Sequence, residues 1–366
     1  MYLKQLRLHQ FRSYSHLALM PPKGLTVFVG ENGAGKTNLL EAIHLCCLGR
    51  SHRTSDDQDM IKIGEQTAAV HATVFRNGRE DDVGVRLFRA QKQKKLIYVG
   101  GKTVLRIGEL MGHMTCVMFS PEDLDIIKGS PQLRRRFIDM LLAQSLSGYF
   151  YALQHYNAVL KQRNALLKMM ARDEQAKVQL FAWDDQLSSA AVPLVRARRE
   201  AVAQLARLSA EHYAFISGRP DEKLEIQYRS LLAESTDIKQ DFQKLLEQSR
   251  TEDLRRLSTT FGPHRDELLL TLSGEELKSF GSQGQIRTAV LAMRLSQIDI
   301  LTKAQGEPPL LLLDDVLSEL DNSRRSRLLS GIAHVQTLLT CTGIDDIHGL
   351  NPACVLRVQA GQITQS

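Results

Sequence analysis

The chain has 366 residues, 43% of them hydrophobic, with 47 lysines and arginines against 41 aspartates and glutamates, a net charge of +6. A chain of this length buries a substantial core and is expected to divide into two lobes. The basic excess suits a polyanionic partner such as nucleic acid. Five scattered cysteines indicate reduced thiols, and no uncharged apolar stretch approaches the ~20 residues that span a bilayer. We therefore expect a soluble cytoplasmic protein with no membrane partner.

A first strand is expected over residues 2–8, where Leu6 and Leu8 lie on one face, and a neighbouring strand over residues 17–20. The turn between them contains Phe11, Arg12, Ser13 and Tyr14. Arg12 either folds back toward a bound nucleotide or remains a solvated surface arginine, and the sequence leaves both interpretations open. It is a candidate nucleotide-binding residue.

An apolar run at 25–29 enters a glycine-rich loop, and the loop opens into a helical pattern over 38–45. The loop residues are Gly30, Glu31, Asn32, Gly33, Ala34, Gly35, Lys36 and Thr37. This order of strand, loop and helix is typical of a phosphate-binding loop, in which backbone N–H groups point at phosphate oxygens at a helix N-terminus. Lys36 is expected to reach the β- and γ-phosphates and the Thr37 hydroxyl to hold Mg²⁺. The chain is therefore predicted to bind a nucleoside triphosphate.

Three more strands are expected over 67–75, 83–88 and 96–99, joined by turns at Asn77-Gly78 and Gly100-Gly101. They predict an antiparallel meander beside the phosphate-loop core.

The pattern then becomes helical from about 122 to 257, with helices from 131, over 149–171, over 187–215 and over 237–257. Pro193 predicts a kink or break in the third of these helices. Arginines cluster on the edges of this region, and they are either solubilising surface charge or contacts to a polyanion: Arg134, Arg135, Arg136, Arg196, Arg198, Arg199, Arg255 and Arg256.

After a strand at 268–272, a turn of small and amide residues leads into an amphipathic helix over 286–301. The turn contains Ser282, Gln283, Gly284 and Gln285. Such a turn exposes a helix N-terminus and is a second candidate for anion binding, although glycine and serine also begin many ordinary helices.

Four leucines, Leu310 to Leu313, predict a strand buried on both faces, and two acids follow it directly. One of the two, Asp314 or Asp315, is expected to serve Mg²⁺ and the other to orient or deprotonate the attacking water. The alternative is that Asp315 merely caps the next helix. Residues 318–321 follow, ending in Asp321, and a last strand over 337–340 with a short tail closes the chain.

With these features in this order, the chain resembles an ABC-type ATPase head and, within that class, the RecF family of bacterial recombination mediators related to SMC proteins. The resemblance runs nearly end to end and includes residues 11–14, 30–37, 51–54, 119–124, 262–266, 281–287 and 312–321. It implies an α/β fold: an ABC-type ATPase head, with a mixed sheet around the phosphate loop plus the antiparallel meander. Residues 1–121 and 258–366 would form this head, and residues 122–257 an inserted all-helical lobe.

The resemblance also implies that two heads dimerise around ATP. Ser282 and Gly284, within the turn 282–285, would close on the nucleotide of the partner subunit, and Asp321 would lie at the same seam. Asp314 would be the acid that binds Mg²⁺. Asp315 stands where most ABC ATPases carry glutamate, and its shorter side chain predicts slow hydrolysis.

The implied role is ATP-dependent DNA binding in recombinational repair and replication restart, with weak, DNA-stimulated ATPase activity. The implied partners are duplex, gapped or single-strand/double-strand junction DNA and the RecO and RecR mediators. Two departures concern the coupling residues: Thr340-Cys341-Thr342 replaces the usual switch histidine, and Ser120 to Asp123 replaces the usual loop glutamine. The alternatives are a short SMC-type structural tether, a transporter ATPase subunit and a small-molecule P-loop kinase.

Overall fold

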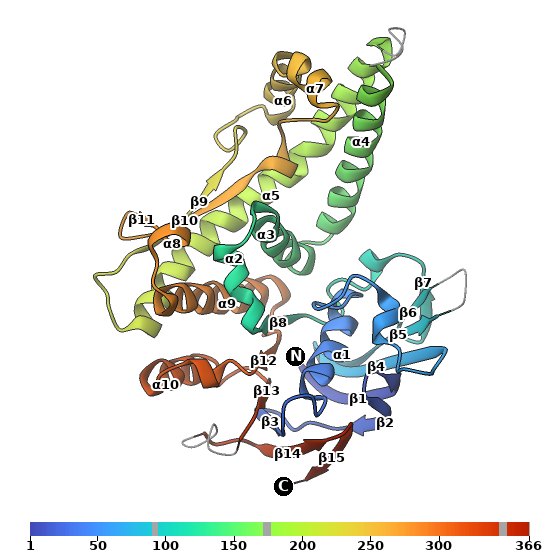
Figure 1. Ribbon diagram of the computed structural model, residues 1–366, viewed down its shortest axis with the longest axis vertical. Coiled ribbons are helices and arrows are strands. Elements are labelled where there is room, and N and C mark those ends of the chain that lie inside the picture. Colours follow the sequence, from blue (N-terminus) through green and yellow to red (C-terminus); the bar gives the residue numbers. More distant parts are fainter. Residues whose placement is uncertain (90–93, 171–176, 344–349, 366) are drawn as a thin grey trace. The chain divides into compact units, whose positions relative to one another are not determined.

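The computed structural model describes residues 1–89, 94–170, 177–343 and 350–365 (Figure 1). Contacts within the chain divide it into two compact units. Unit 1 comprises Met1–Asp123, Phe215–Gly218 and Leu291–Ser366, and unit 2 comprises Leu124–Ala214 and Arg219–Val290. This division differs from the sequence-based boundary at 257/258. The reason is that strand β10 (Glu267–Leu272) pairs with strand β9 (Leu224–Arg229), which ties residues 258–290 to unit 2.

Unit 1 contains a mixed sheet with the strand order β15-β14-β3-β13-β12-β8, in which every pair is parallel except β14 with β15. Its strands are β3 (Leu25–Val29), β8 (Cys116–Phe119), β12 (Leu310–Asp314), β13 (Thr337–Cys341), β14 (Cys354–Gln359) and β15 (Gln362–Gln365). The four leucines of β12 are fully buried between parallel neighbours, as predicted. Strands β14 and β15 were not predicted, and they extend the sheet on the side of β3 that faces away from β13.

The second sheet of unit 1 is antiparallel, with the order β2-β1-β4-β5-β6-β7, and it confirms the predicted meander. Its strands are β1 (Tyr2–Phe11), β2 (Tyr14–Leu19), β4 (Thr67–Arg76), β5 (Arg79–Phe88), β6 (Lys95–Val99) and β7 (Lys102–Val104). Asn77-Gly78 and Gly100-Gly101 each place two consecutive residues at positive φ, the geometry of tight hairpin turns.

Helix α1 (Lys36–Leu48) contacts strands of both sheets, including β4, β5, β12 and β13, and nearly all of its residues are buried. The buried Gln336, which precedes β13, adds a polar link between distant segments. Its Oε1 accepts a hydrogen bond from Leu3 N at 2.6 Å, and its Nε2 donates to the carbonyls of Leu3 at 3.1 Å and Pro22 at 2.9 Å. These bonds fix the N-terminal strand to the sheet that carries the phosphate loop. Helix α10 (Asn322–Gly331) also belongs to unit 1.

Unit 2 consists mainly of helices: α2 (Asp125–Lys128), α3 (Pro131–Ser145), α4 (Tyr149–Met170), α6 (Ile238–Gln248), α7 (Arg250–Arg256), α8 (Leu277–Phe280) and most of α5 (Lys177–Ser217). Helix α9 (Gln283–Gln305) begins in unit 2 and ends in unit 1. A small sheet with the order β11-β10-β9 completes unit 2, where β11 is Glu275–Glu276. The inserted region therefore includes one strand, β9, among its helices. Ala171, expected at the end of α4, lies outside the described residues.

Helix α5 continues through Pro193, so the break expected at this residue does not occur. The proline is exposed, where water can satisfy the carbonyl group that loses its N–H partner. The helix expected over 237–257 is instead two helices, α6 and α7, which meet at Ser249. None of the helices that the structure describes has the length and apolar character that a membrane crossing requires.

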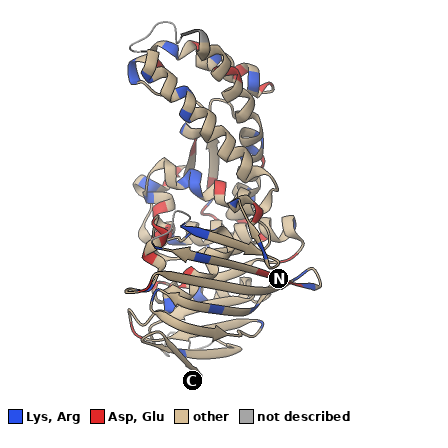
Figure 2. Cartoon of the chain, turned by 90° about the vertical axis from the view of Figure 1, so that its right-hand side faces the viewer, with Lys and Arg blue, Asp and Glu red and all other residues tan. Residues whose placement is uncertain are grey.

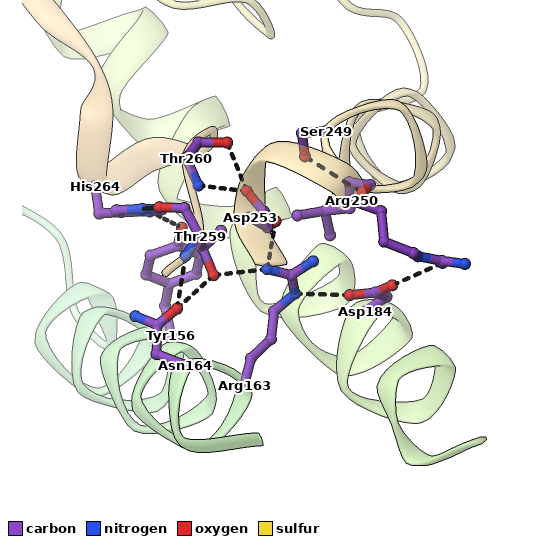
Figure 3. Close-up of polar contacts among 11 residues, drawn as sticks. Tyr156, Arg163, Asn164, Asp184, Ser249, Arg250, Asp253, Thr259, Thr260 and His264 are labelled. Atoms are coloured by element: carbon purple, nitrogen blue, oxygen red, sulfur yellow. Dashed lines mark hydrogen bonds and ion pairs between the residues drawn. The ribbon is translucent and has the colours of Figure 1, made fainter. Parts of the chain in front are cut away.

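A buried arginine joins three helices of unit 2 (Figure 3). The side chain of Arg163 on α4 is 0% exposed. Its Nε donates to Asp184 of α5, and its Nη1 donates to Asp253 of α7, both at 2.7 Å. Nη1 also donates to the Thr259 hydroxyl at 2.8 Å. Because the charges compensate each other away from water, loss of the guanidinium leaves buried carboxylates without their partner.

We predict that Arg163→Met lowers the free energy of unfolding by about 3–5 kcal/mol, the usual cost of breaking a buried charge pair. Urea unfolding followed by circular dichroism measures this change. Arg207→Met is the matched control, because Arg207 of α5 forms an exposed pair with Glu211 and its loss should change little. Equal stability of the two variants would contradict the prediction.

Candidate functional site

The glycine-rich loop lies between β3 and α1, as predicted. Gly35 is the N-cap of α1 with a φ of +111°, and Gly33 has a φ of +81°, a region that favours glycine. A side chain on Gly30 would place its Cβ 2.2 Å from the carbonyl oxygen of Val358. Glycine is therefore favoured at Gly33 and Gly35 by a left-handed backbone, and at Gly30 by the close approach of β14.

Segments far from the loop in sequence hold its backbone in place. The Tyr14 hydroxyl donates to the Gly35 carbonyl at 3.0 Å, and Asn38 Nδ2 donates to the Ser13 hydroxyl at 3.1 Å. Gly361 N donates to the Ala34 carbonyl at 3.1 Å. Sequence reasoning missed these supports. The only available signal was the position of Ser13 and Tyr14 beside Arg12.

The Thr37 hydroxyl and the Asp314 carboxylate meet at the C-terminal end of β12. Thr37 Oγ1 donates to Asp314 Oδ1 at 2.9 Å, and Thr340 Oγ1 donates to the same oxygen at 2.7 Å. Lys36 Nζ lies on the loop itself, 2.5 Å from the Gly30 carbonyl oxygen and 3.0 Å from that of Glu31. Thr340 was missed as a site residue, although it pairs directly with Asp314 across two parallel strands.

The chemistry of this corner fits a divalent cation such as Mg²⁺. Asp314 is 8% exposed, and among the described residues no lysine or arginine forms an ion pair with it. A buried carboxylate of this kind calls for a compensating positive charge. The described residues contain no group of three His, Cys, Asp or Glu side chains that would hold a metal alone. A cation here would therefore take its remaining ligands from phosphate and water, as Mg²⁺ commonly does.

Asp315 follows in a left-handed conformation, with a φ of +52°. Its backbone N–H donates to Thr340 Oγ1 at 3.0 Å, so one threonine hydroxyl orients both consecutive acids. Aspartate adopts this backbone region more readily than most residues. The N-cap of the following turn, Leu317–Glu319, is Val316 rather than Asp315.

A cavity of about 340 Å³ opens at this corner within unit 1. It brings together seven of the predicted site residues: Asn32, Gly33, Gly35, Lys36, Thr37, Asp314 and Asp315. Five others line it that the site prediction did not include: Asn38, Arg53, Pro121, Glu122 and Thr340. Glu122 and Thr340 come from the two segments where the sequence departs from the usual coupling residues. The predicted roles of the individual residues remain predictions.

Arg12 does not line this cavity. It donates through Nε and Nη2 to the two carboxylate oxygens of Glu41 at 2.8 and 2.7 Å, and through Nη1 to the Asp59 carbonyl at 2.6 Å. Burial alone would raise the pKa of Glu41, but hydrogen bonds from Arg12 and Ser51 outweigh it and lower the pKa. The side chain of Arg12 is thus fixed to helix α1, and its contact with a nucleotide stays a prediction.

The predicted second anion-binding turn is the N-terminus of α9. Ser282 Oγ accepts from Gln285 N at 3.2 Å, and Gln285 Oε1 accepts from Ser282 N at 3.0 Å, which together form a capping box. Ser282 and Gln283 are exposed, and Gly284 is half-buried. Asp321 is the exposed N-cap of α10 and accepts from Arg324 N at 3.0 Å. The turn belongs to unit 2, whereas the cavity belongs to unit 1.

Several of the arginines at the edges of the helical region are engaged inside unit 2. Arg134 donates to both carboxylate oxygens of Glu267 at 2.6 and 2.8 Å, and Arg198 binds both oxygens of Asp139 at 2.8 and 3.0 Å. Figure 2 shows basic and acidic positions interspersed along these helices. The polyanion interpretation therefore does not fit Arg134 and Arg198. Others bind elsewhere within unit 2: Arg199 binds two backbone carbonyls, and Arg255 and Arg256 bind Glu252.

Comparison with known proteins agrees with this architecture. The family model RecF/RecN/SMC N terminal domain matches residues 2–342. The DNA replication and repair protein RecF of Shouchella clausii is 41% identical over 376 residues, covering 99% of each chain, and that of Clostridium perfringens is 39% identical over 348 residues, covering 95% of this chain and 94% of that one.

Among solved structures, the recombination mediator protein RecF-ATP in the RecFOR pathway matches with a TM-score of 0.92 at 32% identity, covering 100% of this chain and 97% of that one. An Smc head bound to the C-winged helix domain of ScpA shares the fold, with a TM-score of 0.60 at 17% identity and the same coverage. The fold is thus that of an ABC-type ATPase head of the SMC kind, which confirms the predicted fold class. The chain belongs to the RecF family of DNA replication and repair proteins, and this confirms the resemblance seen in the sequence.

We predict that Glu41→Gln destabilises the protein at neutral pH by on the order of 2 kcal/mol, because Arg12 loses its charged partner. The pKa of Glu41 is lowered from its ordinary 4.5, so the pair stabilises the fold above that pH and the stabilisation is lost as the pH falls through the folded-state pKa. The gap between the urea midpoints of the two proteins, followed from about pH 7 downward, should narrow as the pH falls below 4.5. A gap that is independent of pH would argue against the pair as its source.

Proposed function

We propose that the chain binds ATP with Mg²⁺ in the cavity at the phosphate loop and hydrolyses it slowly. The observation that supports this most directly is the 2.9 Å contact between Thr37 and Asp314, which joins segments 277 residues apart in sequence. The relatives include structures described as RecF-ATP and RecF-ATPrS, which supports ATP as the nucleotide.

The proposed roles follow from the chemistry of each group. The backbone of Gly30, Glu31, Asn32, Gly33, Ala34 and Gly35 cradles the phosphates, and Lys36 leaves the loop carbonyls to bind the β- and γ-phosphates. Thr37 and Asp314 hold Mg²⁺, which when bound would neutralise phosphate charge. Asp315 orients the attacking water and accepts its proton. Because its side chain is one carbon shorter than that of glutamate, we propose that hydrolysis is weak. We propose in addition that DNA stimulates it.

We propose further that ATP joins two copies of the chain. Ser282, Gln283, Gly284 and Gln285 of one copy would meet the nucleotide held by the other, with Asp321 at the same seam. The exposure of Ser282 and Gln283 and the position of the turn at a helix N-terminus support this arrangement. ATP bound between the copies would stabilise the dimer by mass action, and hydrolysis would remove that stabilisation.

The dimer would bind duplex, gapped or junction DNA in recombinational repair and replication restart, in the cytoplasm, with RecO and RecR as partners. The support is the family itself, whose members are described as DNA replication and repair proteins and as mediators in the RecFOR pathway. The net charge of +6 agrees with a phosphate-backbone partner. We assign residues 1–121 with 258–366 to the ATPase head and 122–257 to an inserted helical lobe, although the contacts within the chain group residues 258–290 with unit 2.

Sedimentation velocity with and without ATP tests the dimer, and repetition with gapped duplex at two salt concentrations tests DNA binding. Lys36→Met is the control that should neither bind ATP nor dimerise. A wild-type protein that binds ATP and remains monomeric would refute the two-subunit site.

We predict that Ser282→Arg blocks ATP-dependent dimerisation while the monomer retains its affinity for ATP, because the larger side chain occupies the proposed contact with the partner's nucleotide. Equilibrium titration of a fluorescent ATP analogue and sedimentation separate the two properties. Ser279→Arg, at an exposed position on the preceding helix α8, controls for added charge. A normal dimer in the Ser282 variant would contradict the prediction.

We predict that Asp315→Asn lowers the hydrolysis rate at least ten-fold and prolongs the ATP-bound dimer, since the amide is isosteric and cannot accept the proton of water. Phosphate release and dimer lifetime are the measurements. Turnover equal to that of the wild type would reassign the general base.

A further inference from the structure

A single carboxylate, Glu222, connects the turn at the start of α9 to the end of α5. In the capping box the amide oxygen of Gln285 accepts from Ser282 N, so the amide nitrogen points the other way. This nitrogen lies 3.5 Å from Glu222 Oε1. The opposite orientation of the amide would place Gln285 Oε1 against Glu222 Oε1, so the two contacts together fix the orientation of the Gln285 amide.

Besides the Gln285 amide, two other donors form hydrogen bonds with Glu222. The Tyr213 hydroxyl, on α5, donates to Oε2 at 2.7 Å, and Arg219 Nη1 donates to Oε1 at 2.8 Å. Burial alone would raise the pKa of Glu222, but hydrogen bonds from Tyr213, Arg219 and Gln285 outweigh it and lower the pKa. The side chain is 15% exposed. The carboxylate is therefore charged at neutral pH and confined by three donors.

The end of α5 is fixed on its other side as well. Gly218, directly after the last helical residue, has a φ of +68° and ends the helix in the left-handed region. A Cβ on it would lie 2.3 Å from Arg327 Nη1, and that nitrogen donates to the Ile216 carbonyl at 3.1 Å. Arg327 belongs to α10, the helix that Asp321 caps. The segment 213–222 thus contacts both elements that carry residues proposed to meet a partner copy.

We propose that Glu222 is a positioning residue that couples helix α5 to the turn at Ser282 to Gln285. A displacement of α5 would then change the strength with which this turn of one copy binds the nucleotide held by the other. This role rests on the proposed ATP-dependent dimer. Helix α5 has 41 residues, about 60 Å at 1.5 Å per residue, and a displacement along it reaches the turn through Tyr213 and Glu222.

The test compares Glu222→Ala and Glu222→Gln with Glu211→Ala, an exposed carboxylate on the same helix that pairs with Arg207. Hydrogen exchange of the backbone amides of residues 282–288 is measured in the nucleotide-free protein, and dimerisation with ATP is measured by sedimentation. The affinity of the monomer for ATP and the melting temperature are recorded for each variant.

In Glu222→Ala we expect exchange over 282–288 to rise about three-fold and the dimer to weaken about three-fold, the effect of one long hydrogen bond, with ATP affinity unchanged. Glu222→Gln should lie between this variant and the wild type, because it keeps one acceptor oxygen but loses the second oxygen and the charge. Glu211→Ala should match the wild type in both measurements.

Unchanged exchange over 282–288, or a normal dimer in Glu222→Ala, would overturn the proposal. Exchange that rises throughout unit 2 would show a merely structural role and would overturn it equally. A wild-type protein that stays monomeric with ATP would refute the proposed dimer and any coupling to it, whereas a rise confined to 282–288 would still establish that Glu222 holds the turn.

Discussion

The site depends on one buried carboxylate that two hydroxyls satisfy and no cation of the described chain neutralises. Asp314 receives hydrogen bonds from Thr37 and Thr340, which lie at the ends of α1 and β13. Parallel pairing sets this geometry, because β3, β13 and β12 are neighbours whose carboxyl ends meet at one edge of the sheet. Both hydroxyls bind Oδ1 of Asp314, and the residue lines the cavity in which we propose that Mg²⁺ and phosphates bind.

Both units contain paired buried charges, such as Glu41 with Arg12 in unit 1, but they differ at the nucleotide cavity. Unit 1 leaves a carboxylate uncompensated at its cavity, which suits a site that takes up a cation. Unit 2 pairs its buried charges internally: Arg163 joins Asp184 and Asp253, and Arg198 joins Asp139. Arg163 and Arg198 therefore join helices of unit 2 to one another.

The sequence was sufficient for the elements whose signal is local. The phosphate loop, the buried strand at Leu310–Asp314 and the hairpin turns each carry a pattern within a few residues. Long-range contacts left no such pattern. Three features depend on which segments meet in space: the pairing of Arg12 with Glu41, the contact of the Thr340 hydroxyl with Asp314, and the pairing of Arg134 and Arg198 within unit 2. The sequence around an arginine does not show whether its side chain faces a carboxylate or solvent. Likewise, the sequence did not show that Pro193 lies on the exposed face of α5, where the helix continues through it.

The order of strands in the mixed sheet has a consequence for synthesis on the ribosome. Strand β3 emerges early, but its two partners are β13 and β14, more than 300 residues later, and Gln336 holds Leu3 across a similar interval. The nucleotide pocket, which Thr340 helps to line, can therefore assemble only after translation has passed residue 340, and until then β3 lacks its neighbours in the sheet. Such non-local closure slows folding and exposes nascent chains to aggregation, so early protection by a chaperone would favour the yield of native protein.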